Sequence, residues 1–302
     1  MAKKTVVAIG VFDGVHRGHQ KVLKEAVKIA RRLGAKAFAV TFNPHPLFVT
    51  SPSNVPPSLI SLEHRIKLIY GLNIDRCIVF NFTKDFAGMR PEIFLKDVFV
   101  KKINAGWVVV GEDFCFGKDR SADADFLAQQ GKKLGFKVKK LRMLKYKNFL
   151  ISSSLVRRLI RQGRLSLAEK LLARPVGILG TVVKGNSLGA SIGFPTANIN
   201  PHHEVVPPSG VYVVGVKIDN KRYKGVLNIG TRPTFYGRAK RDKEPTIEAH
   251  IFDFSKQIYG KIVEVLFLKR LRPEKKFIDK EALARQIKRD VQKAKEEICI
   301  FA

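Results

Sequence analysis

Residues 5–34, TVVAIGVFDGVHRGHQKVLKEAVKIARRLG, pass from an apolar, β-branched run to a helical repeat. The run TVVAIGV (5–11) predicts a strand, and the turn after it contains two histidines, His16 and His19. A helix is predicted over 22–34, ending at Gly34, with one apolar face formed by Val22, Ala26, Ile29 and Leu33. The stretch therefore predicts a strand, a turn and a helix in succession.

The same alternation continues through the first half of the chain. Further strands are predicted at 35–42, 75–82, 107–111 and 136–144, with helices at 61–72, 91–103 and 124–135 between them. Apolar strands that alternate with amphipathic helices predict an α/β domain whose parallel sheet is covered on both faces. Ligands bind such sheets at the carboxyl ends of the strands, which is where the two histidines lie.

A change of period marks a second domain. SLAEKLLARP (166–175) predicts a helix with Ser166 and Glu169 as its capping box and Pro175 after its end, so we predict domains at 1–175 and 176–302. Beyond it, period-2 strands at 211–218, 221–230, 245–254 and 261–268, separated by turns such as Asp219-Asn220 and Tyr259-Gly260, predict a small antiparallel barrel. The last helix has Asp279 as its predicted N-cap and an apolar stripe of Leu283, Ile287, Val291, Ala294 and Ile298.

The composition limits the class of protein. The chain has 302 residues, 45% of them hydrophobic, which suits two globular domains. Its three cysteines, Cys77, Cys115 and Cys299, form no CxxC, so neither a disulfide framework nor a zinc site is indicated. No segment approaches the roughly 18 to 20 apolar residues that cross a bilayer, and the apolar start stops at Asp13 without a cleavage pattern. We therefore expect a cytoplasmic protein without a membrane partner, and the oligomeric state stays open.

The net charge of +30, from 56 Lys plus Arg against 26 Asp plus Glu, allows two hypotheses. One is a nucleic-acid-binding protein, and the other is an enzyme that acts on anionic small molecules. The basic residues are spread through every segment, and the densest groups, 132–147 and 157–164, lack the interleaved aromatic residues of a base-stacking surface. We expect a solvated basic surface and no specific nucleic-acid partner.

The turn GVFDGVHRGHQ (10–20) has the features of a phosphate site. A helix N-terminus offers free amides to an anion, and Gly14 and Gly18 allow the backbone to approach a phosphate. His16 and His19 are able to donate hydrogen bonds to phosphoryl oxygens. Neither G-x-x-x-x-G-K-[ST] nor G-x-G-x-x-G occurs in the chain, so the two commonest phosphate loops are absent from the sequence.

The H-x-G-H turn together with ISSSLVR (151–157) resembles the nucleotidyltransferase superfamily, whose partner motif is S-S-[ST]-x-x-R. With TFNPHP (41–46) and VGEDFCFGKD (110–119), the chain resembles the bacterial bifunctional riboflavin kinase/FAD synthetases over nearly its whole length. The resemblance implies a Rossmann-like first domain that transfers AMP from ATP to FMN, giving FAD and pyrophosphate. The FMN phosphate is then the nucleophile, and the protein supplies positioning and charge stabilisation.

The resemblance also implies a role for each motif of the first domain. His16 and His19 hold the ATP phosphates as charge develops on the leaving pyrophosphate. The same site is lined by Asn43 and His45, and phosphates are bound from its opposite side by Ser153, Ser154 and Arg157. The nucleotide and flavin pocket is shaped by Asp113, Phe114 and Gly117.

In the second domain, Gly185, Gly189 and Gly193 recur at intervals of four and lead into FPTAN (194–198). Alternation places Thr196 and Asn198 on one face of an extended chain, and such oxygen ligands suit Mg²⁺ on nucleotide phosphates. GFPTAN resembles the riboflavin kinase signature, in which a glycine loop and the adjoining proline, Pro195 here, cover ATP while the Thr and Asn bind Mg-ATP.

The strand PTIEAHIFDF predicts one face formed by Thr246, Glu248, His250 and Phe252. By the resemblance, Glu248 is the general base that takes the proton from the riboflavin 5′-hydroxyl; the alternative is a carboxylate that faces solvent. NIGTRPTF (228–235), IYG (258–260) and LRPEKKF (271–277) follow in family order, and Arg285 on the last helix faces either the flavin or water.

The chain departs from the family pattern at several positions. Ala190 stands where an arginine is usual, Ala122 and Ala173 stand where glycine is usual, and Val176 stands where an aromatic residue is common. Ser154 in place of threonine keeps the hydroxyl. These departures concern the efficiency of the kinase more than the existence of its site.

Three hypotheses of function follow. The first is a bifunctional enzyme of FAD biosynthesis that forms FMN from riboflavin and then FAD from FMN, with ATP and Mg²⁺ in both steps and flavins as substrates and products. The second is a monofunctional FMN adenylyltransferase with a kinase-weak flavin-binding barrel, which the loss of arginine at Ala190 favours. The third, a noncatalytic nucleic-acid-binding protein, is supported by the charge of +30.

Overall fold

The structure is a computed structural model that describes residues 4–185, 188–202, 204–219, 221–231 and 245–300. It contains two compact units, one made of residues 1–156 and 171–173 and the other of residues 157–170 and 174–302. The boundary predicted at residue 175 stays a prediction, because residues 157–173 are divided between the two units. Asn220, residues 232–235 of NIGTRPTF, and the side chains of Ala190 and Ile298 lie outside what the structure describes.

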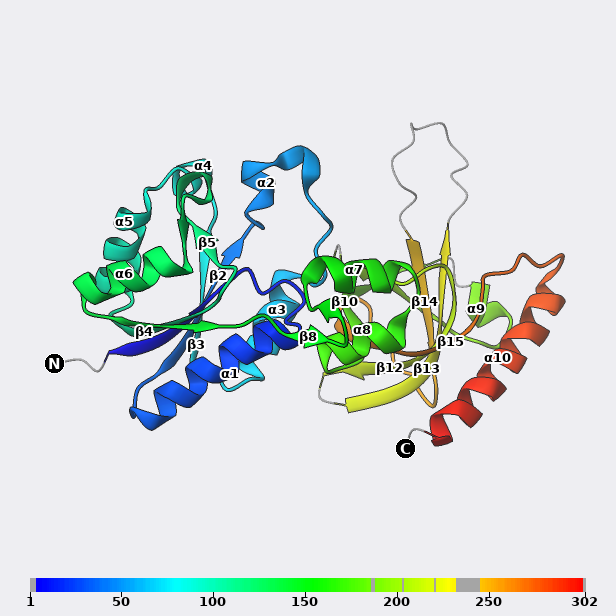
Figure 1. Cartoon of the computed structure of the whole chain (residues 1–302). Helices are drawn as coiled ribbons and strands as arrows, with labels where there is room; N and C mark the ends of the chain where they lie inside the picture. The colour runs from blue at the N-terminus through cyan, green and yellow to red at the C-terminus, as the bar shows by residue number, and fades with distance from the viewer. Residues whose placement is uncertain (1–3, 186–187, 203, 220, 232–244, 301–302) are drawn as a thin grey trace. The chain divides into compact units, whose positions relative to one another are not determined.

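The first unit is built on a five-stranded parallel sheet with the order β3-β2-β1-β4-β7. The α/β class and the five predicted strands are confirmed, as Figure 1 shows. The strands are β1 (Thr5–Ile9), β2 (Ala37–Asn43), β3 (Arg76–Asn81), β4 (Ala105–Gly111) and β7 (Lys137–Leu141).

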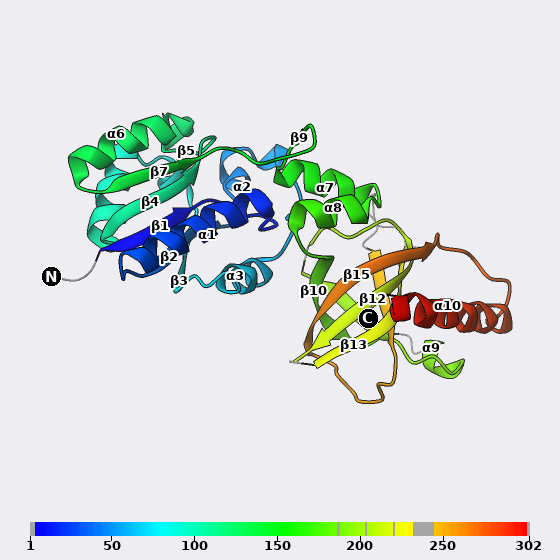
Figure 2. The same cartoon turned by 60° about the horizontal axis from the view of Figure 1, so that its bottom comes forward.

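Helices cover both faces of this sheet, and each face has its own core (Figure 2). On one face, α1 (Arg17–Arg32) and α3 (Leu62–Tyr70) bury aliphatic side chains against β1 and β2. On the other face, α5 (Pro91–Phe94), the π-helical η2 (Leu95–Lys102) and α6 (Ala124–Leu134) form a core rich in phenylalanine. Because both faces of the sheet are buried, the sequences of its inner strands are continuous apolar runs.

Short elements follow the carboxyl ends of the strands and surround the predicted site. After β2 come α2 (Leu47–Thr50) and η1 (Pro52–Asn54), and after β3 comes α4 (Lys84–Ala87). The chain after β4 forms β5 (Cys115–Phe116), η3 (Lys118–Arg120) and β6 (Ala122–Asp123), and the chain after β7 forms β8 (Lys145–Tyr146) and β9 (Phe149–Leu150).

Two predictions about helix ends are wrong. The periodicity predicts Leu33 on the apolar face of this helix, but Leu33 follows α1 as its C-cap and is 50% exposed. Ser166 was expected to cap the helix of 166–175, but α8 (Leu165–Leu172) begins one residue earlier and the Ala168 amide donates to the Arg164 carbonyl. Ser166 and Glu169 are therefore exposed positions within the helix, and α7 (Ser153–Arg161) precedes it.

The second unit is a closed antiparallel barrel with the strand order β10-β11-β14-β13-β12-β15, as the change of period predicts. Two of its strands, β10 (Val176–Val183) and β11 (Ala197–Pro201), were not predicted from the sequence. The others are β12 (Gly210–Ile218), β13 (Lys221–Thr231), β14 (Pro245–Ile251) and β15 (Ile262–Arg272), with α9 (Leu188–Ser191) between β10 and β11.

The last helix, α10 (Lys280–Ile300), packs alongside the barrel (Figures 1 and 2). The predicted N-cap is confirmed, because the Asp279 carboxylate accepts a hydrogen bond from the Ala282 amide. Val291 and the buried Ala294 contact a cluster on β12 and β13. None of the helices in the described part has both the length and the apolar character needed to cross a membrane.

Ala173 adopts a left-handed backbone conformation, with φ at 53°, at a position where the family usually has glycine. A β-carbon makes this conformation unfavourable. We expect Ala173→Gly to raise the free energy of unfolding by about 1 kcal/mol. Ala168→Gly, at a buried helical position, is the control and should lower it by about 1 kcal/mol. Urea unfolding of both variants tests the pair, and a loss of stability in Ala173→Gly would contradict the strain.

Candidate active sites

His16 and His19 lie together at the N-terminus of α1. His16 is the N-cap residue, and its Nδ1 accepts a hydrogen bond from the His19 amide at 3.4 Å. The two rings stack with their centroids 3.6 Å apart and an angle of 19° between their planes. Since Nδ1 of His16 is an acceptor, the neutral ring carries its proton on Nε2. The turn therefore presents two imidazoles at a helix end that favours anions.

Local backbone conformation and packing explain why glycine occurs at positions 14 and 18 of this turn. Gly14 has φ at 83°, and a β-carbon there would lie 2.6 Å from Cδ1 of Leu59. A β-carbon at Gly18 would lie 3.1 Å from Cε1 of the His16 ring. Gly14 thus permits the turn, and Gly18 leaves room for the imidazole. That these glycines also admit a phosphate stays a prediction.

His19 is held in its neutral form. Its Nδ1 is buried and has no hydrogen-bond partner. Burial, followed by the nearby His16 and Arg65, lowers the pKa of His19 well below its usual value of 6.5. At neutral pH the ring therefore acts as a hydrogen-bonding group and not as a cation.

The depressed pKa of His19 predicts a stability change with pH. The unfolded chain takes up a proton on His19 near pH 6.5, whereas the folded chain does so only at lower pH. Protonation therefore favours the unfolded state, and the free energy of unfolding should decrease as the pH falls below about 6.5. Urea unfolding followed by the fluorescence of Trp107, the single tryptophan, measures this above and below that pH. The decrease should be smaller in His19→Gln, and an equal decrease would contradict the assignment.

Arg65 is a buried cation that the sequence interpretation missed. It is 4% exposed, and its Nη1 donates to the carbonyls of Val11 and Phe42 and to Oγ1 of Thr41, at 2.8 to 3.1 Å. Its Nε is buried without a hydrogen-bond partner, and burial lowers its pKa despite the nearby Asp13 carboxylate. The guanidinium thus lies at the carboxyl ends of β1 and β2. Among the described residues, Arg65 and His19 are the two with unpartnered buried side-chain nitrogens.

A cavity of about 840 Å³ lies at the same edge of the sheet. The predicted residues Asp113, Phe114, Gly117 and His45 all line it, next to Gly10 and Val11 after β1. Its aromatic wall consists of Phe42, Phe82, Phe86, Phe94, Phe114 and Phe116, and Lys84, Lys118 and Arg120 lie at its exposed parts. Its volume is within the range of about 300 to 1,000 Å³ that is typical of sites for small organic ligands.

Gly117 has a left-handed conformation, with φ at 77°, that places it directly against Pro91. A β-carbon at this position would overlap the proline ring, so glycine is required both for the backbone and for the contact. Asn43, in contrast, is exposed at the end of β2 and does not line the cavity.

The serine motif begins α7. Ser152 caps the helix by accepting from the Leu155 amide at 3.3 Å, and Oγ of Ser153 donates to the Asp13 carbonyl at 2.8 Å. Ser153, the first residue of α7, is therefore tied to the turn that contains the histidines. Ser154 is exposed, and Arg157 is buried one turn further along the helix. Phosphate binding by Ser153, Ser154 and Arg157 stays a prediction.

In the barrel, Glu248 is the centre of a polar row across three strands. It pairs with Asn198 of β11 on one side and with Asn228 of β13 on the other. Residues directly opposite each other in antiparallel strands have their side chains on the same face, about 4.5 to 5.5 Å apart at Cβ. The row thus joins the predicted base to a predicted metal ligand, and it adds Asn228, which sequence analysis did not select.

The glycine loop lies directly against Thr196 and Asn198. A β-carbon at Gly185 would overlap the Asn198 amide, and one at Gly189 would lie 3.1 Å from Oγ1 of Thr196. Gly193 has φ at 84° with open space around it. The missing side chains therefore leave room for the Asn198 side-chain amide beside Gly185 and for the Thr196 hydroxyl beside Gly189. This donor set fits Mg²⁺, and within the described residues no cluster of three His, Cys, Asp or Glu forms another metal site.

His250 fastens the FPTAN segment to β14. Its Nδ1 lies 2.9 Å from the Pro195 carbonyl oxygen, and its ring contacts the rings of Phe194 and Phe252. The predicted shared face of Thr246, Glu248 and His250 is consistent with their alternation with the buried Ile247, Ala249 and Ile251. Phe252 follows β14 and is buried in the cluster beneath α10.

A second cavity, of about 210 Å³, contains this face. Glu248, Asn228, Thr196 and His250 line it together with Gly189. It is also lined by Arg272, Glu274, Lys275 and Phe277 and by the α10 residues Leu283, Ile287 and Asp290. Arg285 is exposed and does not line this cavity.

A smaller groove lies on the other side of Thr196. It is lined by Pro195 and Ala197, by Ala249 and Ile251 of β14, and by the segment Phe254–Tyr259, which leads into the predicted turn Tyr259-Gly260. Thr196 thus borders both this groove and the cavity that contains Glu248.

Comparisons with known proteins cover nearly the whole chain. Residues 1–155 match the family model for FAD synthetase, and residues 172–298 match the model for riboflavin kinase. A crystal structure described as a macrolide-efflux protein from Streptococcus pneumoniae is similar, with a TM-score of 0.81, 31% identity and coverage of 96% of this chain and 93% of that one.

Two relatives share the description "Bifunctional riboflavin kinase/FMN adenylyltransferase". That of Bacillus subtilis is 39% identical over 295 residues, and that of Escherichia coli K12 is 35% identical over 292 residues. Each alignment covers 96% of this chain and 92% of the relative. The chain therefore belongs to the family of bifunctional riboflavin kinases/FMN adenylyltransferases.

Proposed function

We propose that the chain phosphorylates riboflavin to FMN in its barrel and adenylylates FMN to FAD in its first unit, using ATP in both steps. The observation that carries this proposal is the row Asn198–Glu248–Asn228, in which the carboxylate is paired with Asn198 and lines a cavity together with Asn228 and Thr196. The monofunctional alternative, which the alanine at position 190 favours, is not preferred, because residues 172–298 match the riboflavin kinase model and the relatives are described as bifunctional.

In the adenylyl transfer, the FMN phosphate attacks the α-phosphorus of ATP, and pyrophosphate leaves. The α1 N-terminus offers amides to the phosphates, while His16 and His19 donate hydrogen bonds as charge grows on the leaving group. Arg65 adds a fixed positive charge behind them, held by two carbonyls and a threonine hydroxyl. Because these groups are ordered before the reaction, the transition state is stabilised without reorganisation of the site.

The aromatic cavity is our proposed site for the isoalloxazine ring of FMN. Flat aromatic ligands stack on phenylalanine rings, and here Phe114 and Phe116 are stacked with 5.5 Å between their centroids. Lys84, Lys118 and Arg120 border the same cavity and offer charge to the phosphate of FMN. Gly10 and Val11 connect this cavity to the histidine turn, so the nucleophile and the α-phosphorus meet at the end of β1.

In the kinase reaction, Glu248 accepts the proton of the riboflavin 5′-hydroxyl as the hydroxyl oxygen attacks the γ-phosphorus of ATP and ADP leaves. Asn228, next to Glu248 in the row, orients that hydroxyl. The cavity of about 210 Å³ holds the reacting end of riboflavin, and the groove along Phe254–Tyr259 holds ATP. Thr196 borders both, so the two substrates meet at this residue.

Thr196 and Asn198 would hold Mg²⁺ together with the nucleotide, and the ion would neutralise charge on the β- and γ-phosphates. The close approach of Gly185 and Gly189 to these two side chains supports the assignment. We place the enzyme in the cytoplasm, where ATP is available, and fractionation of cells would test this.

Chromatography of flavins tests the proposal. Purified protein with riboflavin and Mg-ATP should form FMN and then FAD, and supplied FMN should give FAD and pyrophosphate. FAD from FMN but none from riboflavin would support the monofunctional alternative. If riboflavin and FMN both stay unchanged, the proposal is wrong.

A further inference from the structure

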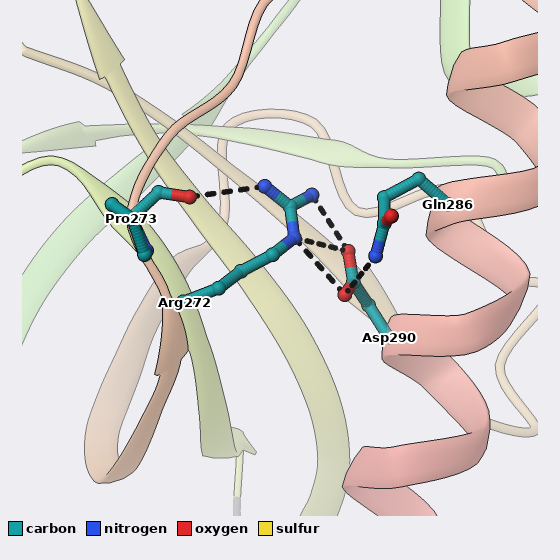
Figure 3. A network of polar contacts seen from close by, with 4 residues as sticks. All are labelled: Arg272, Pro273, Gln286 and Asp290. Carbon is teal, nitrogen blue, oxygen red and sulfur yellow. Dashed lines mark hydrogen bonds and ion pairs between the residues drawn. The ribbon is translucent and has the colours of Figure 1, made fainter.

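A bidentate ion pair joins the end of β15 to α10 (Figure 3). Nε of Arg272 lies 3.0 Å from both carboxylate oxygens of Asp290, and Nη2 lies 2.7 Å from Oδ2. Oδ1 of Asp290 also accepts a hydrogen bond, at 3.0 Å, from the side-chain amide of Gln286, one turn earlier on α10. The remaining amino group, Nη1, donates to the Pro273 carbonyl at 3.0 Å. One guanidinium therefore fixes a strand, the loop after it and two turns of a helix.

Asp290 is buried and Arg272 is partly buried, and both form part of the wall of the cavity that contains Glu248. Asp290 is 5% exposed, and the Arg272 and Asp290 side chains are 15% and 7% exposed. Both residues line the cavity that contains Glu248. A bidentate pair that is largely shielded from water is more specific in its orientation than a surface ion pair, because the geometry of the two parallel hydrogen bonds fixes both groups.

The pair also sets the position of an aromatic residue. The ring of Phe277 lies over the Arg272 guanidinium, with 5.8 Å between Cζ and the ring centroid, and Phe277 lines the same cavity. Because the carboxylate fixes the plane of the guanidinium, it also fixes the face on which the ring rests. Phe277, Leu283 and Ile287 are apolar lining residues of the cavity that also contains Glu248.

A second ion pair between the same two elements offers a comparison. Nζ of Lys269 on β15 lies 2.7 Å from Oε1 of Glu297 on α10, with side chains 47% and 18% exposed. Neither residue lines the cavity. Both pairs join α10 to β15. Of the two, only Arg272–Asp290, the inner pair, lines the cavity.

We propose that Arg272 and Asp290 are positioning residues for riboflavin: their ion pair holds Phe277 and α10 at the distance from Glu248 that the flavin requires. The inference rests on the proposed kinase activity of the barrel. The pair acts on substrate binding and not on the chemical step, since Glu248 comes from β14 and its row does not include β15. Loss of the paired geometry should therefore raise KM for riboflavin and leave kcat nearly unchanged.

The test compares Arg272→Lys and Asp290→Asn with Glu297→Gln in the full-length protein. Lysine at position 272 keeps the positive charge but lacks the planar guanidinium that makes two parallel hydrogen bonds. Asparagine at position 290 keeps the shape of the side chain but lacks the negative charge. We expect KM for riboflavin to rise about tenfold in both inner variants, with kcat within about twofold. Conversion of FMN to FAD should not change in any variant. Glu297→Gln should keep the wild-type KM. Circular dichroism verifies that each variant is folded at the assay temperature, and Asp290→Asn decides if Arg272→Lys does not fold.

Three outcomes would overturn the inference: a wild-type KM in the folded inner variants, an equal rise of KM in Glu297→Gln, or a loss confined to kcat. The wild-type assay separates this from the proposed function. If the wild-type protein binds riboflavin but forms no FMN, the kinase proposal fails. Titration by flavin fluorescence then tests the ion pair separately. Weaker riboflavin binding in Arg272→Lys and Asp290→Asn, but not in Glu297→Gln, supports the positioning role. Unchanged binding in the two inner variants overturns it.

Discussion

Glu248→Gln is expected to reduce the turnover of riboflavin phosphorylation by about 10²- to 10⁴-fold, the usual contribution of a general base. Glutamine keeps the size and the hydrogen-bonding shape of the side chain but does not accept the proton of the 5′-hydroxyl. Glu248 is half-buried on β14 between Asn198 and Asn228, so a neutral amide is easily accommodated in the row. Single-turnover formation of FMN measures the effect on the chemical step.

Two controls make this result specific. Glu274→Gln alters another carboxylate that lines the same cavity but is exposed, and it should leave turnover within a few-fold of wild type. Conversion of FMN to FAD should stay unchanged in Glu248→Gln, because the first unit has its own cavity and core. If Glu274→Gln were the variant that loses turnover, the base would be assigned to the wrong carboxylate.

Local patterns were enough to predict most of the fold. The strands β1 and β4 are largely buried on both faces and are therefore continuous apolar runs, whereas β14 and the first half of β15 alternate between buried and more exposed residues. The strands β10 and β11 were not predicted because the glycines and prolines in and around them are typical of loops. Gly180 on β10 is an example. A β-carbon there would lie 2.8 Å from the Asn200 carbonyl oxygen on the neighbouring strand β11. The glycine signals a close approach of two strands and not a turn.

The candidate sites were predicted where a motif carries several residues within a few positions. HRGH, FPTAN and DFCFG each bring their own side chains together, and the structure places them at cavities or beside one another. Arg65, Asn228 and the pair Arg272–Asp290 were not predicted, because their partners are distant in sequence. Arg65 had one usable signal, since it falls on the buried face of α3 beside Ile69, where an unpaired charge is costly.

His19→Ala is expected to reduce the turnover of FMN adenylylation by about 10²- to 10³-fold, the effect of removing one preorganised donor to a developing negative charge. The buried, unpartnered Nδ1 and the depressed pKa show that the neutral ring is held in place without a protein partner for that nitrogen. Such an arrangement is costly unless a ligand completes it. Riboflavin phosphorylation should be unchanged, and release of pyrophosphate from ATP and FMN measures the loss.

Gln20→Ala separates loss of this donor from loss of structure. Nε2 of Gln20 donates to the carbonyls of Val15 and Leu172, at 2.9 and 2.7 Å, so this variant loosens the same turn without removing an imidazole. It should lower the stability of the first unit but keep turnover within a few-fold of wild type. His19→Gln, which restores an amide donor, should recover part of the activity that alanine loses. Equal activities in His19→Ala and Gln20→Ala would mean that His19 supports the turn, and that the phosphates are held by His16, Arg65 and the amides of α1.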